Sequence, residues 1–253
     1  MLDTGLLLTG ALVWLVVSVA ARWAPAAVLD RAEIVDRLVV PAIVGLLAGR
    51  LVAVVLDDPA SLGSLRAILV IRGGVEFWPG VAVAVVTLAW TLRRQRLDLR
   101  LALGDLAPFL LWGYATYEAA CVVRAGCYGP VSAIGLVPDG LRTRMFPVGV
   151  VVGLVVFGLG FALRHLWTWS PTAKILAAVG GVAAARSVAS IWLPRLGDEP
   201  TRQHLESVAV TLSVAAAVII TLVVARVRRR SARPAERTGS AAPRPAGPAS
   251  EAS

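Results

Sequence analysis

The sequence predicts an all-α, polytopic membrane protein of about seven transmembrane helices, with its N-terminus outside and its C-terminus in the cytoplasm. The first reason is composition: 57% of the 253 residues are hydrophobic and the mean hydropathy is +0.75, whereas soluble domains average about 45–50% apolar residues. The second is arrangement, because the apolar residues form runs close to the roughly 20 residues that a membrane-crossing helix needs. The third is a bias of basic residues toward one side of these runs.

Seven apolar runs predict the membrane spans: 5–21, 36–56, 74–92, 104–121, 147–164, 172–193 and 205–226. The second run, VVPAIVGLLAGRLVAVVL, is the clearest. The fourth carries Asp105, Pro108 and Glu118, so it is expected to face protein or water rather than lipid. Segment 60–72 is too short to cross and is expected to lie along the membrane interface.

Residues 1–226 are therefore expected to form one transmembrane domain, without a cleavable signal peptide. Residues 227–253 are rich in Pro, Ala, Ser and Arg, and are expected to be a disordered cytoplasmic tail. With the N-terminus outside, sixteen basic residues fall on the inner side and seven on the outer side, as the positive-inside rule favours. Arg50 and Arg186 remain within spans.

The remaining composition excludes several function classes. The net charge of +9 could suggest nucleic-acid binding. The basic residues lie between the apolar runs and in the tail, however, so membrane orientation explains them better and no nucleic-acid partner is expected. Cys121 and Cys127 are too few for a disulfide framework, and their spacing fits no common zinc site. Neither a metal nor a cofactor is expected.

Polar residues retained inside spans are candidates for function, because burying them in lipid is costly. In the second span, Gly45 and Gly49 share one helix face and permit close helix packing, and Arg50 follows them. Arg50 could equally be a structural, paired arginine. At the start of the third span, the segment RGGVEFWPG (72–80) offers glycines that a ligand can approach. An ordinary interfacial turn, with Trp78 in the aromatic belt, explains that segment as well.

The richest polar segment is YATYEAACVVRAGCYG (114–129), where the fourth span ends. On a continuous helix, Glu118 neighbours Cys121, and Cys121 neighbours Arg124. The alternative to a site is a Glu118–Arg124 pair that only holds the helix end. In the sixth span, Arg186 is expected to face the bundle interior, and Arg195 follows near the outer end. Both could instead be structural partners of a carboxylate such as Glu118.

Taken in order, these motifs resemble the prolipoprotein diacylglyceryl transferase family over residues 45–215. The segment GLLAGRL (45–51) is like the family's second-span G-x-R-L, and GVEFWPG (74–80) resembles its G-L-S-F-H-G-G. Arg93-Arg94, Asp105 and Ala107-Pro108 resemble its basic loop and D-x-x-A-P. The segment CVVRAGCYG (121–129) is similar to its G-C-F-x-x-G-C-C-Y-G loop, and Arg186 with LPRLGDEP resembles R-F-x-x-E-x-x-R-x-D-x-P.

The resemblance implies a seven-span enzyme of the bacterial cell membrane that moves diacylglycerol from phosphatidylglycerol onto the lipobox cysteine thiol of a prolipoprotein. Its partners would be phosphatidylglycerol, the prolipoprotein and membrane lipid. It implies a general base at Glu118 or Glu76. It also implies these substrate-binding residues: Arg50, Gly74, Trp78, Gly80, Arg124, Gly126, Cys127, Tyr128, Gly129, Arg186 and Arg195.

The chain departs from the family at polar positions. The signature His falls at Trp78, and the signature Arg falls at Glu118 in an ungapped alignment. After Arg186, the family's Glu falls at Ser190 and its next Arg at Leu193. Arg124 and Arg195 are then the candidate replacements for the missing arginines. A second hypothesis is therefore a non-catalytic relative that binds lipid or lipoprotein. A third, less favoured because no inverted repeat is visible, is a small transporter.

Overall fold

The computed structural model describes residues 4–23, 28–29, 31–57, 59–63, 75–124, 126–138, 140–166, 169–192 and 201–231. The long helices are α1 (Thr4–Trp23), α2 (Arg31–Asp57), α4 (Phe77–Arg94), α5 (Leu99–Ala119), α6 (Val148–Phe161), α7 (Pro171–Ala189) and α8 (Arg202–Ser231). Three short helical turns, η1 (Pro59–Gly63), η2 (Ala120–Val122) and η3 (Ala162–Leu166), follow α2, α5 and α6. The chain divides into two units, residues 1–215 and 216–253, and the described part of the second is the rest of α8.

The structure confirms an all-α, multi-pass architecture, with one long helix at each of the seven predicted runs. Five of these helices, α1, α2, α6, α7 and α8, are long and apolar enough to cross a membrane. The one described strand is β1 (Val131–Leu136), which the sequence analysis did not predict and which forms isolated bridges to Met145. Helix α8 continues to Ser231, so residues 227–231 of the predicted disordered tail are helical. Residues 60–63 of the predicted interfacial segment belong to η1, whereas residues 64–72 and 232–253 lie outside the described ranges.

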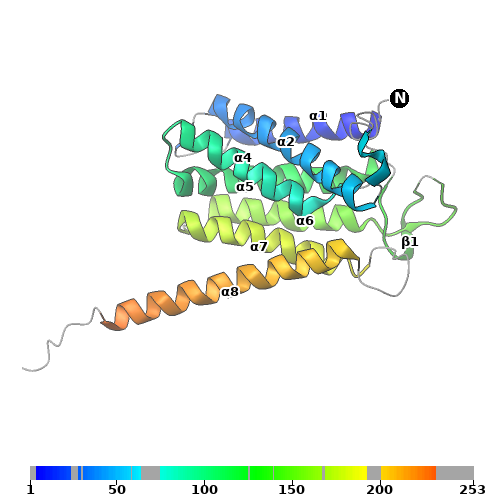
Figure 1. Cartoon of the computed structure of the whole chain (residues 1–253). Helices are drawn as coiled ribbons and strands as arrows, with labels where there is room; N and C mark the ends of the chain where they lie inside the picture. The colour runs from blue at the N-terminus through cyan, green and yellow to red at the C-terminus, as the bar shows by residue number, and fades with distance from the viewer. Residues whose placement is uncertain are drawn as a thin grey trace, which may run out of the picture. The chain divides into compact units, whose positions relative to one another are not determined.

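Successive helices of the first unit run in alternating directions and lie side by side (Figure 1). We call one end of this bundle the cavity end. There α2, α5 and α7 finish, while α1, α4, α6 and α8 begin. Contacts between residues far apart in the sequence hold the helices together at each end of the bundle. Arg202 pairs with Asp57 at the cavity end, and Gly104 faces Pro171 at the opposite end.

Helix α5 is the central helix of the bundle, which explains why its run tolerates polar residues. Nine of its 21 residues are buried, and it packs on α1, α4, α6 and α7. Asp105 accepts a hydrogen bond at 2.9 Å from the backbone N–H of Val28, in the connection between α1 and α2. Pro108 is fully buried within the helix. The prediction that this span faces protein is therefore confirmed.

Glycines bring α2 and α4 together, as the spacing of Gly45 and Gly49 predicts. A Cβ atom on Gly45 would lie 2.7 Å from both the Gly80 carbonyl oxygen and the Ala84 Cβ. The backbone N–H of Glu76 donates to the Gly49 carbonyl at 3.0 Å. This close approach fixes the segment just before α4, and with it the Glu76 side chain, at the cavity end.

Candidate functional site

A cavity of about 800 Å³ lies at the cavity end, lined by α1, α2, α4, α5, α6, α7, the start of α8 and the segment after α5. Apolar residues such as Leu6, Val13 and Leu46 form much of its wall. The charged residues that line it, within the described part of the chain, are Glu76, Glu118, Arg124 and Arg186. The cavity therefore joins an apolar surface to two cations and two anions.

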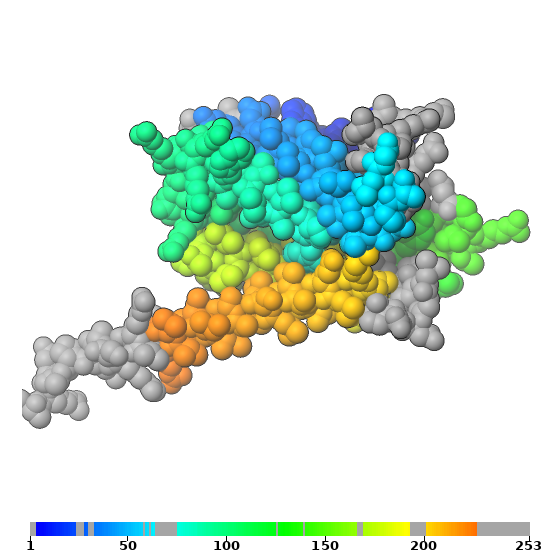
Figure 2. Space-filling view, viewed as in Figure 1, coloured from blue at the N-terminus to red at the C-terminus, as the bar shows by residue number. Residues whose placement is uncertain are grey.

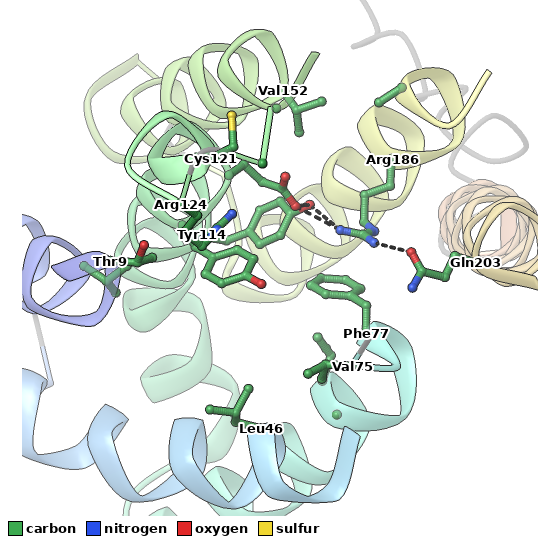
Figure 3. A pocket seen from close by; sticks show the side chains of 18 of the residues that line it. Thr9, Leu46, Val75, Phe77, Tyr114, Cys121, Arg124, Val152, Arg186 and Gln203 are labelled. Atoms are coloured by element: carbon green, nitrogen blue, oxygen red, sulfur yellow. Dashed lines mark hydrogen bonds and ion pairs between the residues drawn. The ribbon is translucent and has the colours of Figure 1, made fainter. Parts of the chain in front are cut away.

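Arg186 is the centre of a polar cluster drawn from three other helices. Its Nη1 donates to the Tyr114 hydroxyl at 2.9 Å and to Glu118 Oε1 at 3.0 Å. Its Nη2 donates to Gln203 Oε1 at 3.3 Å, and its Cζ lies 4.0 Å from the centre of the Phe77 ring. Figure 3 shows Arg186 extended between Tyr114 and Gln203 with Phe77 beside it. These contacts hold the guanidinium in one position.

The Tyr114 hydroxyl completes this cluster by donating to Glu118 Oε1 at 2.6 Å. Tyr114 and Glu118 lie four residues apart on α5, so they share one helix face. The Arg186 and Glu118 side chains are each only 18% exposed. The pair therefore contributes no net charge to the cavity.

Arg124 lies just beyond the end of α5 and differs from Arg186 in its surroundings. Its guanidinium lies 4.2 Å over the Tyr117 ring, and its buried Nη1 has no hydrogen-bond partner. Among the described residues, no carboxylate forms an ion pair with it. Arg124 is thus a cation on the cavity wall whose charge no described carboxylate balances, which suits it to bind an anion.

A disulfide between Cys121 and Cys127 closes the short segment that carries Arg124. The Gly126 backbone N–H also donates to the Cys121 carbonyl at 3.0 Å. These links hold the chain at the end of α5 in a tight loop, so Arg124 and Tyr128 remain on the cavity wall. The sequence analysis excluded a disulfide framework but did not predict this pair.

Glu76, the residue before α4, is only 4% exposed and is bound by Arg202 at the start of α8. Arg202 also pairs with Asp57 at 2.9 Å. The Trp78 Nε1 donates to the Ser207 hydroxyl at 2.9 Å. Figure 2 shows the beginning of α8 lying beside the end of α2. These contacts attach the first turns of α8 to α2 and α4.

The sequence profile of prolipoprotein diacylglyceryl transferase matches residues 5–228. The chain belongs to this family. Among individually curated proteins, none matches the chain. Membership of a family of membrane transferases agrees with the apolar helices and with a cavity that contains arginines.

Most residues that the sequence analysis selected as candidates come together in the cavity. Those that line it are Glu76, Gly80, Glu118, Arg124, Gly126, Cys127, Tyr128 and Arg186. Arg50, Trp78 and Gly129 do not line it. Gly74 and Arg195 lie outside the described residues. Of the two pairings considered for Glu118, the structure shows the one with Arg186 and not the one with Arg124.

Sequence reasoning missed several residues of the cavity. Tyr114 could have been found, because it lies one helical turn before Glu118. Gln203 and Ser207 gave no signal, since polar residues at the start of a span are common and only the packing of α8 brings them to the wall. Ser190, noted only as a departure from the family pattern, also lines the cavity.

Proposed function

We propose that the chain transfers a diacylglyceryl group from phosphatidylglycerol to the lipobox cysteine thiol of a prolipoprotein, as a seven-span protein of the bacterial cell membrane. The cavity end would face the outer side, with the N-terminus outside and the C-terminus in the cytoplasm. Family membership supports the reaction class. The observation that carries the specific proposal is Arg124, a cation on the cavity wall without a carboxylate partner among the described residues.

A phospholipid has the two chemical parts that the cavity can receive. Its phosphate would meet Arg124, and its acyl chains would lie along the apolar wall formed by α1, α2 and α4. Arg186 would be a second donor near the phosphate, held in place by Glu118. Figure 3 shows the Arg124 and Arg186 side chains at the same cavity. We assign Glu118 to orienting Arg186, because its Oε1 already accepts from Arg186 and Tyr114.

The proposed reaction forms a sulfur–carbon bond and breaks a carbon–oxygen bond. The substrate thiolate forms a sulfur–carbon bond with the glyceryl carbon that carries the phosphate, and the carbon–oxygen bond to the phosphate breaks. Glycerol phosphate leaves with the electron pair, and the thiol proton is released. Negative charge gathers on the leaving phosphate, so a fixed guanidinium beside it lowers the barrier.

Two observations support the outward orientation of the cavity end. The opposite end carries most of the described basic residues outside the helix interiors, among them Arg22, Arg93, Arg94 and Lys174, as expected for a cytoplasmic side. The Cys121–Cys127 disulfide lies at the cavity end, and disulfides persist on the oxidising outer side of a bacterial membrane.

Expression in cells depleted of their own transferase tests the proposal. The wild-type chain is expected to restore the mass shift of a reporter prolipoprotein that gains a diacylglyceryl group. Arg124→Ala is expected to fail, whereas Arg144→Ala, at an exposed arginine in the segment after β1, is expected to succeed. An unmodified reporter, with the wild-type protein present and folded in the membrane, would contradict the proposal.

One observation favours a second candidate, a non-catalytic lipid-binding relative. Trp78, at the position of the family's signature His, donates to the cavity-lining Ser207 but does not itself line the cavity. Under this alternative, purified protein would carry phosphatidylglycerol but transfer nothing. Loss of that lipid in Arg124→Ala, without any transfer by the wild type, would favour it.

A further inference from the structure

Ser190 and His204 form a hydrogen-bonded pair at the cavity. Ser190 caps the C-terminus of α7, one helical turn beyond Arg186, and lines the cavity. Its hydroxyl oxygen lies 2.6 Å from Nδ1 of His204. Ser190 is 9% exposed, so its hydroxyl can meet a molecule in the cavity while remaining shielded from bulk solvent.

His204 is held in position by its neighbours along α8. Its backbone N–H donates to the Thr201 carbonyl at 2.9 Å. The preceding residues attach the helix start to the bundle, since Arg202 binds Glu76 and Gln203 binds Arg186. The imidazole is therefore fixed against the end of α7.

The proposed reaction needs a group that accepts the thiol proton, because the thiolate is the nucleophile. The two carboxylates on the described cavity wall are both bound by arginines, Glu118 by Arg186 and Glu76 by Arg202. No histidine lines the cavity among the described residues. His204 reaches it through the Ser190 hydroxyl, and His165 lies at the opposite end, with its ring tilted against Phe161.

We infer that Ser190 and His204 form the proton-accepting pair for the substrate thiol. This inference rests on the proposed function. Ser190 Oγ takes the thiol proton while its own proton passes to Nδ1 of His204. The sulfur then bonds to the glyceryl carbon, the carbon–oxygen bond breaks, and the proton on His204 leaves to the released phosphate or to water. Ser190 contacts the reacting thiol, and His204 acts through it.

The arrangement requires one orientation of the Ser190 hydroxyl. A serine hydroxyl carries a single proton, and the Ser187 carbonyl lies 2.8 Å from the same oxygen. The pair operates when the proton points to Nδ1 and the imidazole carries its proton on Nε2. A substrate thiol that donates to the Ser190 oxygen would favour the orientation in which the hydroxyl proton points to His204 Nδ1 rather than to the Ser187 carbonyl.

The test measures kcat and KM for transfer from phosphatidylglycerol vesicles to a lipobox peptide. His204→Gln retains a side chain that can bond Ser190 but takes no proton, and is expected to lower kcat about 100-fold or more, with KM for the lipid nearly unchanged. Ser190→Ala is expected to behave similarly, and Ser190→Thr to retain activity. His165→Gln, at the exposed histidine of the opposite end, is the matched control.

Chemical rescue separates proton transfer from a structural role. Added imidazole is expected to restore transfer by His204→Ala, because it can occupy the space of the lost ring. A wild-type kcat in His204→Gln would overturn the inference. So would a loss of transfer that imidazole does not restore, in variants whose melting temperatures are lowered. In both cases an active wild type would still sustain the proposed function. A folded wild type that transfers nothing would overturn both.

Discussion

The Arg186 guanidinium and the Glu118 carboxylate lie 68 positions apart in the sequence and meet at 3.0 Å. The contact joins α7 to α5 at the cavity end. The Tyr114 hydroxyl bonds to both groups. Because Gln203 accepts a hydrogen bond from Arg186, the pair also links the start of α8 to the bundle. A single ion pair therefore organises the wall of the cavity and fixes the direction in which Arg186 points.

Breaking this pair from one side is expected to destabilise the protein. Arg186→Ala leaves the Glu118 carboxylate, which is only 18% exposed, without its charged partner. Removing one member of a buried ion pair costs roughly 3–5 kcal/mol. The melting temperature of purified Arg186→Ala in detergent should therefore lie below that of the wild type, and Glu118→Ala should lower it by a similar amount.

The double variant Glu118→Gln/Arg186→Gln provides the control, because it removes both charges together. It is expected to be more stable than either single alanine variant, since no unpaired charge remains. Single variants with wild-type melting temperatures would show that the pair does not organise the cavity wall.

The contact between α2 and α4 is expected to tolerate no side chain at Gly45. In Gly45→Ala the new methyl group would meet the Gly80 carbonyl oxygen and Ala84 Cβ, each at 2.7 Å, and overpacking of this kind costs about 1–3 kcal/mol. Gly158→Ala, in α6, is the matched control because a Cβ there has no neighbour within 4 Å. Thermal unfolding should separate the two variants, and equal melting temperatures would contradict the packing.

The sequence predicted the helices well because each long apolar run has one physical solution in a membrane. The run at 147–164 became α6 (Val148–Phe161), and the run at 104–121 became α5 (Leu99–Ala119). Close packing at Gly45 followed from helix periodicity alone. Local patterns of this kind need no knowledge of the tertiary arrangement.

The site was less predictable because its contacts join residues far apart in the chain. Glu76 and Arg202 are 126 positions apart, and no pattern in either segment points to the other. Strand β1 likewise depends on bridges to Met145, and the position of His204 depends on how α7 ends and α8 begins. The family pattern marked Ser190 as a lost carboxylate, whereas its hydroxyl contacts an imidazole that only the fold brings near.

The disulfide is expected to keep both cysteines inaccessible to thiol reagents. Protein isolated without reductant should show no alkylation by a maleimide, and should gain two labels per chain after reduction, since the sequence has two cysteines. The Cys121→Ser/Cys127→Ser variant should lose about 2 kcal/mol of unfolding free energy, because the bond closes only a short loop. Labelling before reduction would show that the pair is not formed.

Binding of the lipid phosphate by Arg124 is the central claim, and a transfer assay tests it most directly. Purified protein is mixed with phosphatidylglycerol vesicles and a lipobox peptide, and the diacylglyceryl adduct is measured by mass spectrometry. The wild type and Arg144→Ala should form the adduct, and Arg124→Gln should form it about 10²–10³-fold more slowly. Wild-type rates in a folded Arg124→Gln variant, or no adduct from the folded wild type, would contradict the account.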